Sequence, residues 1–228
     1  PWKEVVCADS LQWLARLPDH GLPPGCAGFT SIPDVSELDT LFGSGSATDF
    51  PAYQEWFVDA AALFLSKLAK RSYCLFLQSD VRVLDRGNAV GWVDKALLCG
   101  RAADRTGFRM AWHKLVLSSD ISARSVGRPG YSHFMCFTNE EIGSGYRSTD
   151  FSIPDVFPRG HMIWNKGIGL DSCYAGVRFL RDVIGAGVLV DPFCGRGTTL
   201  AMANALGMAA LGVEISRRRC SQAARLHV

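Results

Sequence analysis

The residues with the clearest chemical potential lie near the C-terminus, in a strand, a glycine loop, a helix and a second strand. An apolar run over residues 188–190 ends in Asp191, and a loop that contains Gly195 and Gly197 follows it. An alanine-rich helical segment then leads to a second apolar run, which ends in Glu214. Glycines let a ligand approach the backbone closely, and an acid at the end of the second strand can bind ribose hydroxyls. The spacing predicts a β-loop-α-β unit that binds a nucleoside.

Two common ligands of such loops are disfavoured. A phosphate-binding loop needs Lys followed by Ser or Thr after its last glycine, and this loop lacks that pair. A dinucleotide loop needs Gly or Ala at the position of Leu200. A nucleoside without a diphosphate fits best, although a tight turn that packs a helix on a sheet explains the glycines alone equally well.

The full string is more specific than its glycines. DPFCGRGTT, a helix and GVEIS resemble the S-adenosylmethionine (SAM) site of amino-methyltransferases, which methylate exocyclic amines of adenine or cytosine. The usual loop of that family reads Asp-Pro-Phe/Pro-Cys/Met-Gly-Ser-Gly-Thr, and this chain departs from it at Arg196. The resemblance implies that Asp191 and the loop backbone face the methionine part of SAM, while Glu214 binds the ribose hydroxyls. In this segment it implies the cofactor-binding residues Asp191, Pro192, Phe193, Gly195, Gly197, Thr198, Glu214 and Ile215.

Other candidate cofactor-binding residues lie elsewhere in the chain. The acid after the first expected strand corresponds to a residue near the SAM adenine, although Asp9 can equally be a helix N-cap. Thr30 ends the strand before the catalytic motif. Lys166 and Gly167 match the position of a segment that folds back over SAM, but not its His-Pro-rich wording, and a basic loop before a helix explains them equally well. His133 matches a family position and is expected to be a core residue with a satisfied polar edge.

The catalytic motif of the family reads Asp/Asn/Ser-Pro-Pro-Tyr/Phe/Trp. The matching candidate catalytic residues here are Ser31, Ile32, Pro33 and Asp34. In that motif a side-chain oxygen and a backbone carbonyl hold the amine protons, and the aromatic ring stacks on the base. Ser31 keeps an acceptor and Pro33 keeps a rigid turn, whereas Asp34 cannot stack. Either Asp34 supplies a new acceptor or base for the amine, or the site no longer catalyses; Phe42 is the aromatic near enough in sequence to replace the stacking ring.

The order of the expected elements indicates an α/β fold class. Helices over residues 53–69 and 93–106 alternate with strands over residues 73–77, 108–117 and 131–138. The amine motif precedes the SAM loop, as in the circularly permuted β class of amino-methyltransferases. The resemblance implies a Rossmann-like SAM-dependent methyltransferase fold, with a seven-stranded mixed sheet and helices on both faces. We expect a single methyltransferase domain over residues 1–228 without a separate target-recognition domain.

Composition agrees with one globular domain in a reducing compartment. A 48% hydrophobic and 20% charged chain of 228 residues can bury a sizeable core, and no apolar run reaches the roughly 18 residues of a membrane span. Eight cysteines without a CxxC pair indicate buried thiols and no metal site, which favours an intracellular protein of the cytoplasm or nucleus.

These features predict a SAM-dependent methyltransferase that modifies an exocyclic base nitrogen of nucleic acid by direct in-line displacement. A net charge of only +2 and the lack of a recognition domain favour RNA over DNA, with a protein partner that supplies substrate recognition and no membrane. The alternative is a catalytically inactive SAM-fold subunit that binds RNA or a partner methyltransferase. A methyltransferase for protein or small molecules is a third possibility, and an NAD-dependent enzyme is a distant fourth.

Overall fold

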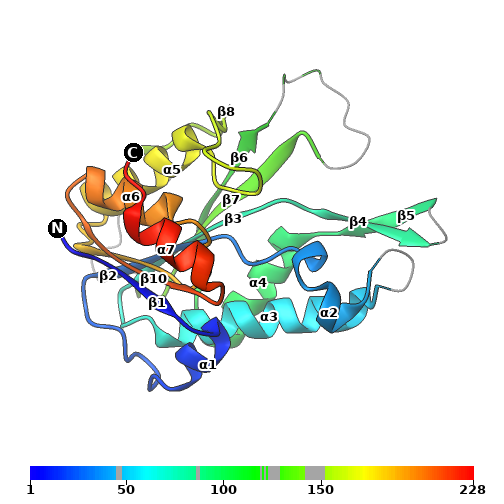
Figure 1. The fold of residues 1–228 in the computed structure, drawn as a ribbon, viewed down its shortest axis with the longest axis horizontal. Coiled ribbons are helices and arrows are strands. Elements are labelled where there is room, and N and C mark those ends of the chain that lie inside the picture. The colour runs from blue at the N-terminus through cyan, green and yellow to red at the C-terminus, as the bar shows by residue number, and fades with distance from the viewer. Residues whose placement is uncertain (45–47, 86–87, 119, 121, 123–128, 142–151) are drawn as a thin grey trace.

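A mixed sheet forms the centre of the molecule (Figure 1). The computed structural model describes residues 1–44, 48–85, 88–118, 120, 122, 129–141 and 152–228. Eight described strands lie in the order β1-β10-β9-β2-β3-β7-β6-β8. Their bounds are β1 (Lys3–Cys7), β2 (Cys26–Thr30), β3 (Tyr73–Gln78), β6 (Arg109–Leu117), β7 (Tyr131–Thr138), β8 (Val156–Pro158), β9 (Val188–Asp191) and β10 (Ala209–Glu214). The expected α/β fold class is confirmed, and the short edge strand β8 adds an eighth strand to the seven expected.

The strand directions explain why distant motifs meet. The strands β1, β10, β9, β2 and β3 are parallel, whereas β7 runs antiparallel to both β3 and β6. Carboxyl ends of parallel strands share one edge of a sheet, which is where open α/β sheets bind ligands. Because β9 lies between β2 and β10, the segments that follow these three strands are neighbours at this edge.

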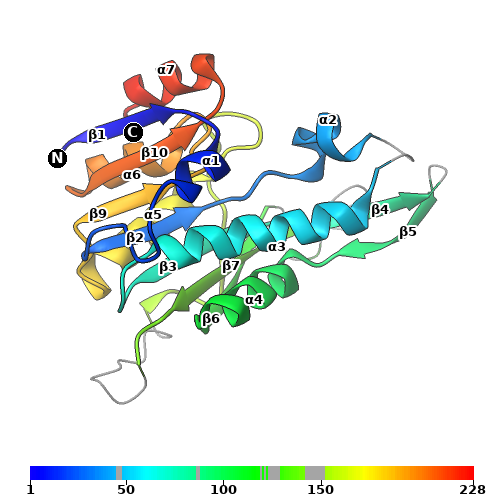
Figure 2. The ribbon, with the colours of Figure 1, turned by 90° about the horizontal axis from the view of Figure 1, so that it is seen from below.

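Helices cover both faces of the sheet (Figure 2). One hydrophobic core includes residues of α1 (Ser10–Ala15), α3 (Phe50–Lys67) and α4 (Lys95–Thr106). The other core includes residues of α5 (Leu170–Arg178), the π-helical turn η4 (Phe179–Val183), α6 (Thr198–Ala205) and α7 (Arg217–Arg225). Two short helices, η1 (Val35–Glu37) and α2 (Asp39–Phe42), follow β2.

The long core helix α3 begins earlier than its apolar pattern predicts. Asp49 is its N-cap, and its Oδ1 accepts a hydrogen bond from the backbone N–H of Ala52 at 3.0 Å. Pro51 lies in the first turn, where its missing N–H would have no helical partner anyway. The helix therefore starts at Phe50, before the periodic apolar residues begin, and it ends at Lys67.

A hairpin that the sequence analysis did not predict leaves the sheet after β3. Its strands β4 (Val81–Asp85) and β5 (Asn88–Val93) are antiparallel, and they extend away from the sheet at the right of Figure 1. Val81 pairs with Val93 at the base of the hairpin. This pairing brings Asp80 and Asp94, which lie on either side of the hairpin in sequence, close together.

Two sequence expectations concern membranes and thiols. Within the described ranges, no helix combines the length and the apolar character that crossing a membrane requires. All eight cysteines are free thiols, and seven are buried as expected, while Cys7 is exposed.

Candidate active site

A cavity of about 880 Å³ opens at the carboxyl edge of the parallel strands. It lies within the usual size range of sites for small ligands, which is roughly 300–1,000 Å³. Thirteen of the sixteen candidate site residues line it, namely Asp9, Ser31, Ile32, Pro33, Asp34, Lys166, Gly167, Asp191, Phe193, Gly195, Thr198, Glu214 and Ile215. The other three candidates, Thr30, Pro192 and Gly197, are outside the cavity lining. Each of these three supports a neighbour instead.

Asp191 connects the two motifs that are far apart in sequence. Its carboxylate is 3% exposed and accepts hydrogen bonds from the Thr30 hydroxyl at 2.7 Å and the Thr199 hydroxyl at 2.6 Å. The backbone N–H of Phe193 donates a third bond at 3.1 Å. Burial raises the pKa of Asp191 to about 6, although all three donors favour the ionised form. Thr30 therefore anchors the central acid from the strand that leads into the amine motif.

The glycine loop needs its glycines for two different reasons. Gly195 and Gly197 have φ values of 55° and 81°, which favour glycine. A Cβ on Gly195 would lie 3.1 Å from the Trp164 ring, and one on Gly197 would lie 2.8 Å from the Ala223 Cβ. Gly195 thus permits the close approach of Trp164, and Gly197 permits α6 to pack beside α7. Just after the loop, the Thr198 hydroxyl oxygen is buried without a hydrogen-bond partner and belongs to a cavity-lining residue.

Glu214 supplies a second acid at the end of β10. It is 6% exposed, and its Oε1 accepts a hydrogen bond from the backbone N–H of Ser216 at 2.8 Å. Burial raises the pKa of Glu214, while that N–H and the Arg219 guanidinium oppose the shift. Ile215 beside it is 67% exposed and lines the cavity. This pair presents a carboxylate and an apolar surface to the same ligand space.

Asp9 is the N-cap of α1 and also lies at the cavity. Its side chain caps α1 by accepting a hydrogen bond from the Gln12 N–H at 2.8 Å, and the residue also lines the cavity. The adjacent Ser10 hydroxyl donates to the Pro192 carbonyl, which fixes the start of α1 against the glycine loop. Pro192 contributes to the site through this contact.

The segment before α5 lies against the glycine loop. The Arg196 guanidinium carbon lies 4.9 Å from the Trp164 ring centroid, a distance typical of cation-π contacts. Arg196, the residue at which this loop differs from the usual family sequence, therefore packs on an aromatic ring. Lys166 adopts a φ of 72° and pairs with Glu37 at 3.5 Å, so it connects this segment to η1. These contacts enclose the cavity between the two motifs.

The amine motif follows β2 on the other side of the cavity. Ser31 and Asp34 line the cavity, and the backbone carbonyl of Pro33 accepts a hydrogen bond from the Tyr53 hydroxyl at 3.0 Å. Asp34 also caps η1, because its Oδ1 accepts from the Ser36 N–H at 3.1 Å. Ile32 is 2% exposed and anchors the motif in the core. Ser31 and Asp34 are thus both part of the cavity wall directly after β2.

The expectation that Phe42 replaces the stacking aromatic is wrong. Phe42 packs edge-on against Tyr53 and Trp56, with centroid distances of 5.8 and 5.9 Å, and is not among the cavity-lining residues. Phe42 is the last residue of α2, and its ring packs against α3. Trp56 of the same aromatic cluster does line the cavity.

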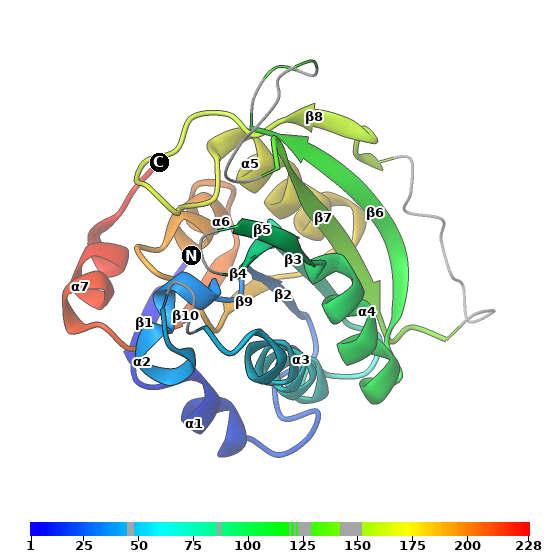
Figure 3. The ribbon, with the colours of Figure 1, turned by 90° about the vertical axis from the view of Figure 1, so that its right-hand side faces the viewer.

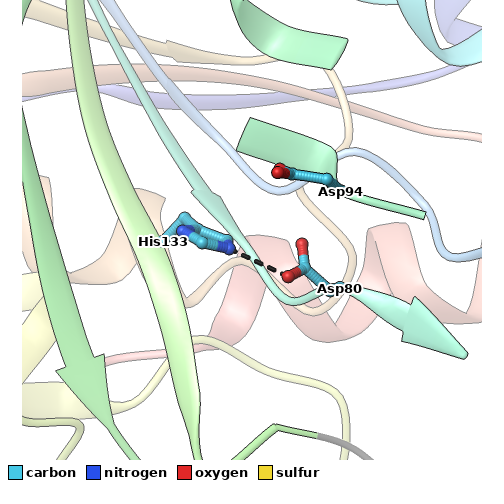
Figure 4. A group of neighbouring side chains, drawn as sticks. All are labelled: Asp80, Asp94 and His133. Carbon is cyan, nitrogen blue, oxygen red and sulfur yellow. Dashed lines mark hydrogen bonds and ion pairs between the residues drawn. The ribbon is translucent and has the colours of Figure 1, made fainter. Parts of the chain in front are cut away.

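A cluster of polar side chains, with Asp80 buried and Asp94 exposed, lies at the base of the hairpin of β4 and β5 (Figure 4). The atoms of Asp80, Asp94 and His133 that could ligate a metal ion lie within 4.8 Å of one another. Two carboxylates and an imidazole are ligands that suit a divalent cation. Both carboxylate oxygens of Asp80 already accept hydrogen bonds, from the Lys95 backbone N–H and from His133 Nε2, each at 3.0 Å. Burial raises the pKa of Asp80, but these two donors outweigh it and hold the pKa below its usual value. His133 is thus a core residue with a satisfied polar edge, as expected.

The cavity wall also contains residues that sequence reasoning did not select, among them Trp56, Lys95, Trp164 and Arg219. Lys95 was detectable only as the residue after a helix N-cap signal, and Trp164 only as an aromatic next to a basic loop. Neither signal carries chemistry by itself.

Comparisons with known proteins agree with this geometry. Residues 184–225, which contain the glycine loop and both acids, match the family model described as DNA methylase. No curated protein matches the chain in sequence. Over this segment, the chain is similar to DNA methylases.

Solved structures of DNA methylases resemble this chain in fold over almost its whole length. TTHA0409 from Thermus thermophilus, in complex with SAM, is 17% identical with a TM-score of 0.70, over 98% of this chain and 93% of its own. The cytosine-N4-specific PvuII DNA methyltransferase is 14% identical with a TM-score of 0.72, over 98% and 86%. The M1.HpyAVI complex with SAM is 10% identical with a TM-score of 0.56, over 99% and 100%. The expected fold is confirmed, and a methyltransferase with SAM as cofactor is what the family match and these structures support.

Proposed function

We propose that this DNA methylase-like chain transfers a methyl group from SAM to an exocyclic amine of a nucleic-acid base. One observation carries the proposal: the hydrogen bond between Thr30 and Asp191 ties the strand that leads into the amine motif to the start of the glycine loop, and both motifs line one cavity. The cavity therefore has a cofactor wall and a target wall at a shared edge, as a transfer between two bound molecules requires.

The residues of the cofactor wall fit SAM. Asp191 and Glu214 provide two buried carboxylates for a ligand with ammonium and sulfonium charges and two ribose hydroxyls. The unpartnered Thr198 hydroxyl gives a further polar contact, and the exposed Ile215 gives a flat apolar surface for adenine. The set contains no basic side chain from the loop itself, because Arg196 packs on Trp164. Lys166 and Arg219, two of the basic residues that line the cavity, are each paired with an acid, Glu37 and Glu214 respectively. The wall therefore suits a cation better than a phosphate.

The target wall then has to orient the amine and remove one proton. SAM supplies the methyl group: the amine lone pair forms the new N–C bond, the electron pair of the broken S–C bond stays on sulfur, and one amine proton must leave. Ser31 and the backbone carbonyl of Ile32 would accept hydrogen bonds from the amine, and the Asp34 carboxylate would take the proton. Holding the amine in this geometry supplies most of the rate gain, because the reaction becomes effectively unimolecular.

The base identity and the polymer remain predictions of the proposal. RNA over DNA follows from the low net charge of +2, whereas the PvuII enzyme acts on cytosine in DNA. A protein partner that presents the substrate would compensate for the low charge. The single-domain organisation and the cofactor roles given to Lys166 and Gly167 are part of the same proposal.

The test is transfer of labelled methyl from SAM to total RNA and to genomic DNA, with nuclease and protease controls on the product. Asp34→Asn is the informative variant, because asparagine can still cap η1 but carries no charge. We expect the variant to keep its SAM affinity in calorimetry and to lose most of its turnover. Transfer by the variant at the parent rate, or protein that binds SAM but labels neither polymer, contradicts the proposal and favours an inactive SAM-fold subunit.

A further inference from the structure

Asp34, the residue that departs from the aromatic of the family motif, has a buried lysine beside it. The Lys95 ammonium lies 3.7 Å from Asp34 Oδ2, and the two side chains are 3% and 15% exposed. Both residues line the cavity. Because both groups are largely shielded from solvent, the carboxylate and the ammonium stabilise each other's charged forms more strongly than a surface pair does.

Lys95 is itself held in place by its surroundings. Its backbone N–H donates to Asp80 Oδ1 at 3.0 Å, and Asp80 Oδ2 lies 3.0 Å from His133 Nε2 (Figure 4). His113 Nε2 lies 2.9 Å from the other ring nitrogen of His133, so the network extends to β6. The start of α4 is thereby fixed to β3 and β7. Figure 3, which looks at the molecule from the hairpin side, shows α4 beside α3.

The aromatic rings of α3 complete the environment of the ammonium. Lys95 Nζ lies 5.9 Å from the Tyr53 ring centroid and 5.8 Å from the Phe57 ring centroid. Both distances suit cation-π attraction, which stabilises the ammonium without neutralising it. The lysine side chain is therefore restrained by α3 on one side and by Asp34 on the other.

We propose that Lys95 is a positioning residue that keeps Asp34 ionised and directed into the cavity for the amine proton. This inference rests on the proposed function. A carboxylate that is mostly buried takes up a proton near neutral pH unless a cation offsets the lost hydration. A protonated Asp34 could not accept the amine proton, so the pair with Lys95 keeps the acceptor competent.

The other charged and titratable groups around Asp34 do not replace Lys95. Glu37 lies on the adjacent 3-10 turn and is paired with Lys166, and its negative charge disfavours ionisation of Asp34. Tyr53 of α3 has its pKa raised by burial and by the negative charge of Asp34, so it stays neutral. From α4, Lys95 is the cation paired with Asp34.

The direct test follows the Asp34 carboxyl carbon by ¹³C NMR across pH, with Asp34→Asn used to assign its resonance. Lys95→Met keeps the volume but removes the charge, and Lys95→Arg restores the charge. Lys67→Met is the matched control, because Lys67 is 6% exposed and paired with Asp19 at 2.6 Å, away from the cavity. We expect Lys95→Met to raise the titration midpoint of Asp34 by about one pH unit or more.

The catalytic consequence is read from the pH profile of methyl transfer. In the Lys95→Met variant, the pH below which kcat/KM falls should be higher than in the parent, by the same interval as the NMR midpoint of Asp34. The affinity for SAM should stay unchanged. Lys95→Arg should return both the NMR midpoint and the rate profile toward the parent, and Lys67→Met should alter neither. If Lys95 had only a structural role, Lys95→Met would lower the free energy of unfolding without shifting the acid side of the pH profile.

Two results overturn the inference. One is an Asp34 midpoint in Lys95→Met equal to that of the parent; the other is a shifted midpoint with an unchanged rate profile. Failure of the proposed function looks different: the parent binds SAM but transfers no methyl. In that case the inferred role of Asp34 in proton transfer is wrong as well. The NMR titration still decides whether Lys95 keeps Asp34 ionised.

Discussion

The ionisation of Asp191 should be visible in the pH dependence of folding. The carboxyl group is 3% exposed, and burial raises its pKa from 3.8 to about 6. A group whose folded pKa lies above its unfolded value stabilises the protein when protonated, and this stability is lost as pH rises through the folded pKa. With these two pKa values, lowering the pH from 8 to 5 should stabilise the fold by roughly 1–2 kcal/mol through this group.

The variant Asp191→Asn isolates this contribution. Its amide oxygen can keep the bonds from the Thr30 hydroxyl and the Phe193 N–H, and its amide nitrogen faces the Thr199 hydroxyl, which can turn to accept. The variant carries no charge at any pH, whereas the other titrating groups are common to both proteins. The free energy of unfolding of the parent, relative to the variant, should therefore be roughly 1–2 kcal/mol greater at pH 5 than at pH 8.

Urea denaturation of both proteins at these two pH values gives the difference directly. Calorimetry provides a second readout, because SAM is a cation and should prefer the ionised carboxylate. At pH 5 about one molecule in ten has Asp191 ionised, so the affinity of the parent for SAM should be roughly 10-fold weaker than at pH 8. If the free energies of unfolding of the parent and the variant differ by the same amount at both pH values, burial does not raise the pKa of Asp191. If Asp191→Asn binds SAM at pH 8 as tightly as the parent, Asp191 has no role in cofactor binding.

Two further predictions concern the cofactor wall. Glu214→Gln should weaken SAM binding by about 10-fold or more, because ribose hydroxyls would lose a charged acceptor, and calorimetry that finds equal affinity contradicts this. Gly197→Ala should destabilise the protein by about 1–3 kcal/mol more than Gly207→Ala, as measured by urea denaturation. Both glycines have positive φ, but only at Gly197 would the new Cβ meet a neighbour, 2.8 Å away; Gly207 has open space, so equal losses would contradict the packing argument.

The SAM-binding unit was predictable because its determinants are local. The apolar run, the glycine loop and the acid at the end of the next strand lie within 30 residues, and each depends on short-range rules of strand ending, positive φ and helix start. The structure builds β9, α6 and β10 from them with Asp191 and Glu214 at the expected strand ends. The amine motif was predictable for the same reason, since Ser31 and Pro33 directly follow β2.

Other parts of the site depend on pairings between distant segments. The hairpin of β4 and β5 escaped prediction because its strands expose apolar side chains such as Val90 and Trp92 and lack the apolar pattern of a core strand. Lys95 gave no signal, since a lysine after a helix cap is ordinarily solvated. Phe42 gave a misleading one, because proximity in sequence does not determine which way a ring on α2 turns.

The sequence by itself indicated the fold class and, through the family resemblance, the cofactor loop and the proposed catalytic motif, because strand periodicity and turn chemistry act over a few residues. Only the tertiary structure shows which groups surround the altered motif residue, Asp34. The Thr30 to Asp191 bond spans 161 positions, and the pair of Asp34 with Lys95 joins two elements separated by a long helix, a strand and a hairpin. Burial and charge pairing at such distances arise from the packing of the whole sheet and its helices, and no short stretch of sequence encodes them.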